Sequence, residues 1–393
     1  MTPQQIKENL NQYKWEKWLA RPFGAFLMST FTSVSNIRNI GIDAEMIGFI
    51  YQRGFWYFSH EVYEDFASQL EKWMAENDKT IFDITLSCKK FYEKSKKEIL
   101  KMVKEDRADK NDMIKLEAIF KGCSAYIWLA HGLEEIYMGR LKKEVPKYWA
   151  GDPVLFIGDI SFPKKKNAHV IFEEKLRSSE SLLKIQKQFG WMRIRDSFED
   201  PFSIEELKEL REKVKKEKKV PVKKVKAPKE IKQLVEETKE LVFYRTYRTD
   251  VFYELLFLAR PIFKKYGKKL GLEFQEMRNC RIEDLINGVV KKYPHLVTAA
   301  QYKSDYAFFD EDVVLEEKLS SEEIRGSIAF MGVAKGIVKI VGSVKDLSKV
   351  GDGDVLVTNM TTPNYLVAMQ RAIAFVTDEG GGLPATLLSL RGR

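Results

Sequence analysis

Cysteine is scarce in this chain: only Cys88, Cys123 and Cys280 occur among 393 residues, far apart from one another. Three isolated cysteines exclude a disulfide framework and a CxxC metal site, so we expect reduced thiols, as in the cytoplasm. Apolar runs are also short, and none approaches the roughly 20 residues that a bilayer-spanning helix needs. The N-terminus, Met-Thr-Pro-Gln-Gln, lacks the basic-then-apolar pattern of a signal peptide. These absences predict a soluble, cytoplasmic protein that makes no membrane contact.

Motifs for binding nucleotides and metals are absent from the sequence as well. Neither a GxGxxG nor a GxxxxGK loop occurs, and no HxxxH or HExxH pattern is present. We therefore expect no metal site and no cofactor bound by this chain itself. The four histidines stand alone in the sequence, and we interpret each as a surface or core residue: His60, His131, His169 and His295.

Most of the net charge of +9 comes from one segment. Residues 211–232 contain eleven Lys or Arg against three Glu, two prolines and no aromatic residue. A nucleic-acid surface would spread its basic residues over a face and interleave them with exposed aromatics. We interpret the segment as a solvated helix end followed by a flexible linker. Nucleic-acid binding is the weaker alternative.

Residues 1–150 are predicted to form a helical domain. Apolar residues recur at three- and four-residue steps from Ile47 through Phe58 to Met74, and again over 83–103 and 112–138. Tryptophans at helical spacing are more often core residues than stacking sites for a ligand. That interpretation covers Trp15, Trp18, Trp73 and Trp128.

Three segments follow this domain. Residues 151–210 are predicted to be a second helical segment, in which Ser203 and Glu206 form a capping box. After the basic linker of 211–232, residues 233–324 are predicted to be a helical connector with one or two helices over 235–272. Arg245 and Arg248 are three residues apart and share a helix face. We expect them at the surface in ion pairs rather than at a phosphate.

The pattern changes near Arg325, where short apolar runs alternate with glycines. We predict strands over 327–331, 337–341, 354–357 and 374–376. A short helix over 365–372 would begin with Thr362 at its N-cap and Pro363 in its first turn. The predicted fold class is therefore α + (β/β/α), mostly helical up to residue 324 and β-rich over 325–393.

The C-terminal motifs resemble a known family. Asp-Val-Leu-Val-Thr at 354–358, Thr-Thr-Pro at 361–363 and Ala-Phe-Val-Thr-Asp-Glu-Gly-Gly at 374–381 resemble the mobile phosphohistidine domain of phosphoenolpyruvate-utilizing enzymes. Phosphoenolpyruvate synthase, pyruvate phosphate dikinase and rifampicin phosphotransferase share that swivelling domain. Residues 151–210 and the connector resemble, more loosely, segments of synthase-like proteins. The resemblance implies a site shaped by Thr361, Thr362, Pro363, Thr377, Asp378, Glu379, Gly380 and Gly381.

The family's catalytic histidine is missing from this sequence. In the family a Thr-Ser-His-Ala-Ala or Thr-Cys-His-Ala-Ala box follows the glycine pair, but no histidine follows Gly381 here, and the ungapped position is Ala385. With suitable synonymous codons, residues 383–393 translate one base earlier as Ile-Ala-Cys-His-Ala-Ala-Ile-Val-Ala-Arg-Glu. That string matches the family box. We therefore expect a frameshift that removed the histidine and left the mobile domain incomplete; the alternative is a natural, degenerate C-terminus.

The resemblance implies a phosphoryl-transfer component, a kinase-type transferase with a phosphohistidine intermediate, that is inactive as written. ATP or phosphoenolpyruvate, with Mg, would be bound by an ATP-grasp or phosphoenolpyruvate-barrel partner, because neither domain is recognisable in this chain. The alternative from a different class is a non-catalytic helical scaffold or regulatory protein. In that case the swivelling domain would serve as a docking module.

Overall fold

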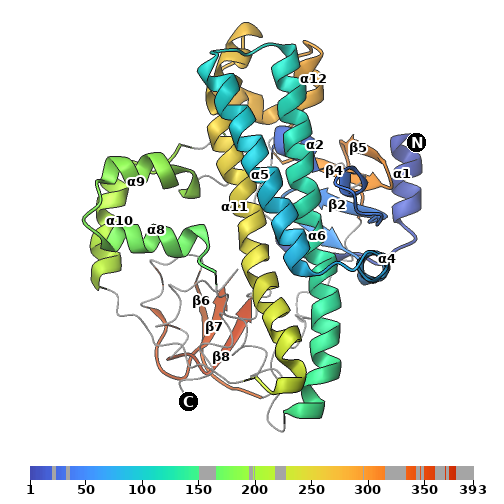
Figure 1. The fold of residues 1–393 in the computed structure, drawn as a ribbon, viewed down its shortest axis with the longest axis vertical. Coiled ribbons are helices and arrows are strands. Elements are labelled where there is room, and N and C mark those ends of the chain that lie inside the picture. The colour runs from blue at the N-terminus through green and yellow to red at the C-terminus, as the bar shows by residue number, and fades with distance from the viewer. Residues whose placement is uncertain are drawn as a thin grey trace.

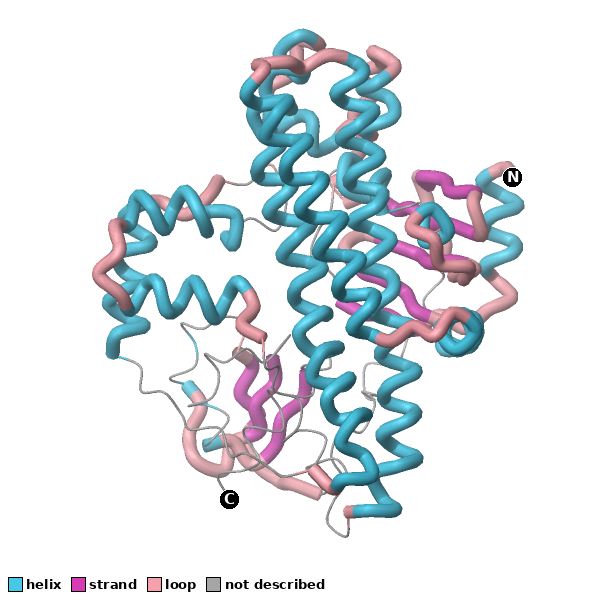
Figure 2. The backbone as a smooth tube through the Cα atoms, viewed as in Figure 1, coloured by secondary structure: helices cyan, strands magenta, loops and turns pink. Residues whose placement is uncertain are grey.

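The computed structural model shows long central helices with a sheet on one side and a helical lobe on the other (Figure 1). Helices dominate, and the strands gather in two separate sheets (Figure 2). The prediction of a mostly helical protein with small β-rich parts is confirmed. The structure describes residues 1–19, 24–31, 36–149, 165–193, 198, 200–216, 227–294, 296–314, 333–341, 346, 349–358, 368 and 371–377.

Three long helices form the centre of the fold. They are α5 (Ile81–Lys104), α6 (Lys110–Tyr148) and α11 (Lys232–Lys269). The apolar period predicted α5 and α6, and one or two helices were predicted over the range of α11. A capping box begins α6, where the Asp109 and Asp112 carboxylates accept each other's backbone N–H at 2.9 and 3.1 Å. Helix α11 packs against both α5 and α6, and the buried apolar side chains of all three helices belong to one core.

A five-stranded antiparallel sheet lies beside these helices in the order β1-β3-β2-β4-β5. Its central strand β2 pairs with β3 on one side and with β4 on the other, so Ile50 lies opposite Ala300. Phe49 and Tyr51 face the helical core, while Ile50 packs toward α1 on the opposite face. The strands are β1 (Glu16–Leu19), β2 (Gly48–Gln52), β3 (Phe55–Phe58), β4 (Thr298–Tyr302) and β5 (Asp305–Phe309).

The prediction that the apolar residues from Ile47 to Phe58 belong to a helix is wrong. They form the β2–β3 hairpin, whose two-residue turn holds Arg53 and Gly54 at φ 49° and 93°. The predicted helical connector of 233–324 is helical only in part, because β4 and β5 complete the sheet. The misreading has a physical cause: all five residues of β2 are buried, so this strand lacks the polar alternation that marks a half-exposed one.

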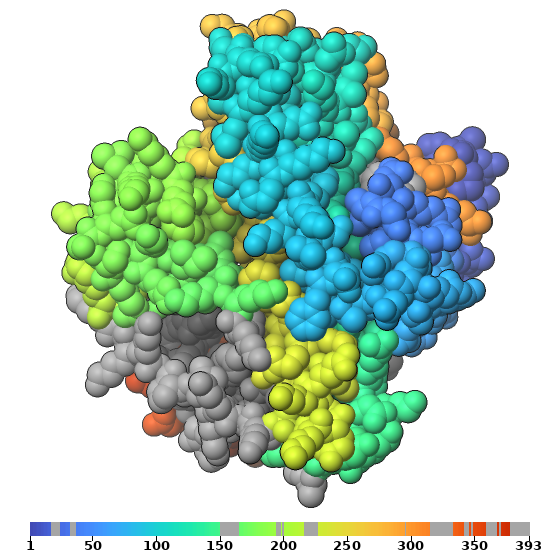
Figure 3. All heavy atoms as spheres, in the orientation of Figure 1, coloured from blue at the N-terminus to red at the C-terminus, as the bar shows by residue number. Residues whose placement is uncertain are grey.

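Shorter helices surround this framework. At the N-terminal end are α1 (Pro3–Leu10), α2 (Ala25–Phe31), α3 (Asn36–Asn39) and α4 (His60–Glu76). The lobe, green in Figure 3, consists of α8 (Ala168–Arg177), α9 (Leu182–Phe189), the 3-10 helix η1 (Gly190–Arg193) and α10 (Ile204–Lys216). The 3-10 helix η2 (Lys229–Ile231) precedes α11, and η3 (Phe274–Asn279) and α12 (Ile282–Ile286) follow it. Across the ranges that the structure describes, we find no helix with the length and apolarity of a membrane span.

The lobe confirms the capping box read from the sequence. The Ser203 N–H donates to Glu206 Oε2 at 2.8 Å, and the Glu206 N–H donates to Ser203 Oγ at 3.1 Å. Helix α10 then carries the chain into the basic segment, where Arg211 donates to the Leu176 carbonyl at 3.1 Å. The basic segment thus begins as the end of a helix, as predicted. Residues 217–226 lie outside the described residues.

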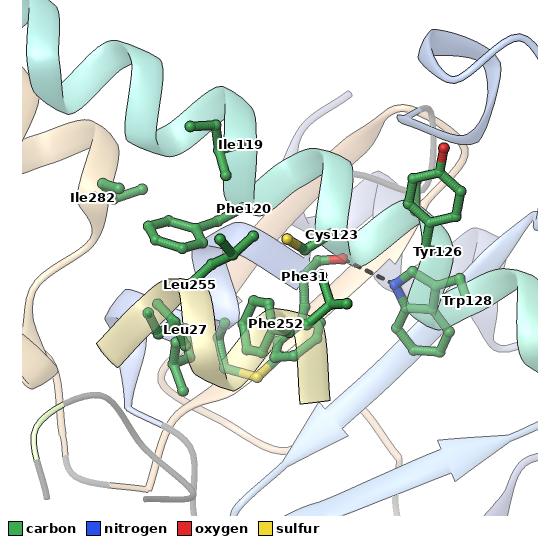
Figure 4. Close-up of a cluster of buried hydrophobic side chains, with 14 of the residues drawn as sticks. Leu27, Phe31, Ile119, Phe120, Cys123, Tyr126, Trp128, Phe252, Leu255 and Ile282 are labelled. Atoms are coloured by element: carbon green, nitrogen blue, oxygen red, sulfur yellow. Dashed lines mark hydrogen bonds between the residues drawn. The ribbon is translucent and has the colours of Figure 1, made fainter. Parts of the chain in front are cut away.

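Aromatic side chains fill the core between α2, α6 and α11 (Figure 4). The fully buried Phe252 ring lies 5.2 Å from that of Phe31, centroid to centroid. The Trp128 indole N–H donates to the Phe31 carbonyl at 3.3 Å. The core interpretation is confirmed for Trp128, which is 3% exposed. Of the other tryptophans, Trp15 and Trp73 pack partly buried against the core, and the side chain of Trp18 is not among those described.

Arg245 and Arg248 were both predicted to lie at the surface in ion pairs. The prediction is confirmed for Arg245 and wrong for Arg248. Arg245 does lie at the surface, in an ion pair with Glu134 at 2.5 Å. Arg248 is buried instead, and its guanidinium donates to the backbone carbonyls of Ile127, at 3.1 Å, and Arg245. Burial lowers the pKa of this guanidinium. Backbone carbonyls satisfy the donors of the buried cation, so it needs no carboxylate partner in direct contact.

Candidate functional site

A second, three-stranded sheet lies near the C-terminus. Its strands β6 (Val338–Ile340), β7 (Val355–Thr358) and β8 (Ala374–Thr377) are parallel and lie in that order. They confirm the strands predicted over 337–341, 354–357 and 374–376. The predicted strand over 327–331 and most of the predicted helix over 365–372 lie outside the described residues.

The parallel arrangement brings the carboxyl ends of β7 and β8 to one edge of this sheet. Thr358 and Thr377 are register partners and end their strands side by side. The Thr-Thr-Pro segment begins three residues after Thr358, and the Asp-Glu-Gly-Gly segment follows Thr377 directly. Carboxyl ends of parallel strands share an edge, which is where such sheets bind ligands. Of the predicted site residues the structure describes Thr377; Thr361, Thr362, Pro363, Asp378, Glu379, Gly380, Gly381 and Ala385 lie outside the described residues.

The opposite, amino edge of the sheet is held by backbone hydrogen bonds. The Gly353 N–H donates to the Arg371 carbonyl at 2.9 Å, and the Ile373 N–H donates to the Asp354 carbonyl at 2.8 Å. Gly353 adopts φ +82°, and a Cβ atom at Gly336 would collide with its carbonyl oxygen. These contacts fix β7 against β8, and therefore also fix the relative position of the two strand ends.

The C-terminal unit, by which we mean the described residues within 333–377, has its own small core. Leu356 is fully buried among Val341, Val350, Ala368 and Ala372, with Phe375 packed against them. Wherever a hydrogen bond or ion pair of this unit joins two described residues, both partners lie within the unit. Its core shares no residue with the core of the body, which denotes the described residues of 1–314. The described part of the unit therefore has a core of its own.

None of the described histidines belongs to the C-terminal unit. His60 and His169 are exposed on the body, and His60 lies 3.5 Å from a Glu16 carboxylate oxygen. His131 is partly buried among the rings of Phe58, Tyr63 and Trp128. His295 is not described. Among the residues that the structure places, no cluster of three His, Cys, Asp or Glu side chains suits a metal ion.

The surroundings of His131 predict how stability responds to pH. Loss of hydration, with Arg248 and Arg245 nearby, lowers the imidazole pKa from 6.5 to about 3. Between these values the unfolded chain binds a proton that the folded chain does not bind, so stability falls as pH drops below 6.5. The slope from this one group is at most about 1.4 kcal/mol per pH unit. We expect H131F to flatten the dependence of the unfolding free energy on pH between about 4 and 6.

The control for this measurement keeps the histidine and lowers stability at another core residue. A V62A variant removes two buried methyl groups from α4, where Val62 is 2% exposed, and should lower stability without changing the slope. Denaturant titrations at several pH values give both quantities. A slope in H131F equal to that of the unsubstituted protein would contradict the burial of a neutral imidazole.

A known family model matches the part of the chain that contains β7 and β8. Residues 350–384 match the family model described as PEP-utilising enzyme, mobile domain. The match begins just before β7 and includes both strand ends. It covers less than a tenth of the chain, so it concerns the C-terminal unit and not the body.

Similarity to curated proteins is also confined to part of the chain. A probable phosphoenolpyruvate synthase of Archaeoglobus fulgidus is 51% identical over 71 residues, 18% of this chain and 9% of that protein. One of Methanocaldococcus jannaschii is 35% identical over 132 residues, 34% of this chain and 10% of that protein. The phosphoenolpyruvate synthase of Pyrococcus furiosus is 41% identical over 75 residues, 18% of this chain and 9% of that protein. The chain thus spans about a tenth of the length of these curated relatives and is similar to phosphoenolpyruvate synthases over part of its own length.

Proposed function

We propose that this chain is a phosphoryl-transfer component similar to phosphoenolpyruvate synthase and pyruvate phosphate dikinase. The observation that carries the proposal is the edge at which Thr358 and Thr377 end their strands within residues 350–384. In the sequence, both motif segments follow these two strand ends, as a shared phosphoryl site would require. The fold of the C-terminal unit supports the proposal through its parallel strands and its apolar face toward Ala368 and Ala372.

The C-terminal unit would act as the swivelling part of this component. A domain that visits two active sites must not be held by strong contacts at either one. Its separate core, and bonds that stay within the unit, are consistent with such movement. The body would then serve as the support from which the unit moves, with the connector α11 as its longest element after α6.

The chain as written would be inactive because its sequence has no histidine after the glycine pair. An imidazole nitrogen is both nucleophilic near neutral pH and able to release the phosphoryl group again. Ala385 offers neither property. We propose that a frameshift near Gly382 removed the histidine. Sequencing the DNA that encodes residues 377–393 tests this: an overlapping frame encoding Ile-Ala-Cys-His-Ala-Ala supports the frameshift, and its absence supports a naturally degenerate C-terminus.

A partner would supply the nucleotide or phosphoenolpyruvate together with Mg. The chain shows no phosphate-binding loop of its own, so an ATP-grasp or phosphoenolpyruvate-barrel protein would provide that chemistry. The missing histidine also favours a second function, a non-catalytic scaffold that docks through the C-terminal unit. Phosphate transfer to a protein with the restored frame separates the two, because a scaffold would bind the partner without accepting phosphate.

A further inference from the structure

The outer face of α5 carries an excess of positive charge. Six of the seven lysines of this helix are exposed, against two exposed acidic residues. The half-buried Lys96 pairs with Glu254 at 2.8 Å. Lys101 pairs with Glu105 at 3.8 Å. Among the described residues no ion pair forms at the other five lysines, which are Lys89, Lys90, Lys94, Lys97 and Lys104. Most of the positive charge on α5 therefore has no carboxylate partner in the described part of the chain.

These lysines share their side of α5 with two exposed leucines. Residues three, four and seven positions apart lie on one side of a helix, so Leu86, Lys90 and Lys97 follow one another along α5. Leu86 is 51% exposed, and Leu100, on the same side, is 44% exposed. We call this surface the lysine face, and it consists of Leu86, Lys89, Lys90, Lys94, Lys97, Leu100, Lys101 and Lys104. Like charges three and four residues apart destabilise a helix, so a negatively charged partner would stabilise this face.

Helix α4, which precedes α5 in the chain, has the opposite charge. It exposes five acidic residues and one lysine. Glu71 pairs with Arg140 at 2.8 Å, and Glu76 lies 3.8 Å from Lys72. Among the described residues no cation pairs with the other three, which we call the acidic turn and which are Glu61, Glu64 and Asp65. Residues 60–104, blue to cyan, lie across one face of the molecule (Figure 3), so a single partner can reach both helices.

A second copy of this chain is the partner that matches both faces. No ion pair between described residues joins α4 to α5 within one chain, so each face keeps its charge. In a twofold dimer the lysine face of each copy meets the acidic turn of the other, and the same contact is made twice. Residues 86–104 and α4 each extend about 26 Å along helices about 10 Å wide. Two such contacts bury about 1,000 Å² over both copies, which is the lower limit for a specific interface. One contact alone would bury about half of that area, so the area favours the symmetric arrangement.

We infer that the protein forms a twofold dimer in which the lysine face of each copy binds the acidic turn of the other. The interface lies on the body and does not depend on the proposed function of the C-terminal unit. Exposed ion pairs each contribute little and are screened by salt, so the dimer is weak and sensitive to ionic strength. Contacts of Leu86 and Leu100 supply the part of the affinity that salt does not screen.

Sedimentation equilibrium of the 393-residue protein tests the dimer. We expect a dimer at low salt that dissociates at about 1 M salt, where the Debye length falls to about 3 Å. The variant K90E/K97E should raise the dissociation constant about tenfold or more, because twofold symmetry places like charges against each other at both contacts. E61K/E64K should have the same effect. The fourfold variant K90E/K97E/E61K/E64K exchanges the charges of the two faces and should recover most of the affinity.

A matched control comes from α6, where Lys142 and Lys143 are exposed outside both faces. K142E/K143E makes the same change of net charge and should leave the dissociation constant unchanged. Circular dichroism spectra equal to that of the unsubstituted protein show that each variant is folded. A monomer at low salt, or a K90E/K97E dimer as tight as the unsubstituted one, would overturn the inference. A folded fourfold variant that fails to associate would equally overturn the pairing of α5 with α4.

Discussion

With a cognate ATP- or phosphoenolpyruvate-dependent partner, the 393-residue protein should incorporate no acid-labile phosphate, whereas the protein with the restored frame should be labelled stoichiometrically. The expected difference is all or none, because the nucleophile is absent in one protein and present in the other. Radiolabel from the phosphoryl donor, lost on mild acid treatment, measures phosphohistidine. Alanine in place of the histidine of the restored box is the control and should abolish labelling.

Labelling of any of the four histidines in the sequence would be the contrary outcome. Acid-labile label on any of them in the 393-residue protein would falsify the proposal that the missing box is the site of transfer. His131 is the least suited, since its ring packs among aromatic side chains. The exposed His60 and His169 lie on α4 and α8, outside the C-terminal unit.

Replacing Phe252 by alanine should give the largest loss of stability from a single substitution in the body. The ring is fully buried and contacts those of Phe31 and Phe120, with centroids 5.2 and 6.2 Å away. Truncation of a buried phenylalanine leaves a cavity and costs about 3–5 kcal/mol. Denaturant unfolding followed by circular dichroism measures the change, because most of the described helices share this core.

Phe82 offers the matched control on the surface. It lies on α5 and is 44% exposed, so F82A removes the same atoms from a site that retains water contact. We expect a loss within about 0.5 kcal/mol. Equal losses in F252A and F82A would contradict the central position assigned to the Phe252 ring. Nuclear magnetic resonance signals from the core of the C-terminal unit should be unchanged in both variants, because that core shares no residue with the core of the body.

The long helices were predictable because their signals are local. Apolar residues at three- and four-residue steps predicted α5 and α6, and the Ser203–Glu206 box predicted the start of α10. The β2–β3 hairpin escaped because both faces of β2 are buried, which removes the alternation of a strand. A usable signal was present: Arg53-Gly54 between aromatic-rich runs is typical of a two-residue turn with positive φ.

Other features depend on contacts that no sequence pattern carries. The burial of Arg248 follows from the position of α11 against α6, where the Ile127 carbonyl accepts its N–H. The pairing of β2 with β4 joins segments from opposite ends of the body. At the candidate site, the motif predicted the strands of the small sheet, whereas the position of Thr358 beside Thr377 needed the strand register.

The position of β4 and β5 in the large sheet has a consequence for synthesis of the protein. A ribosome completes residues 16–58 early, but β2 gains its second neighbour only after residue 302 has been translated. Contacts over such long sequence separation form slowly. Once β5 is in place, however, the body contains every strand of its sheet before translation reaches the segment matched at 350–384. A chain whose reading frame changes after that point would therefore still contain every strand that the body needs to complete its large sheet.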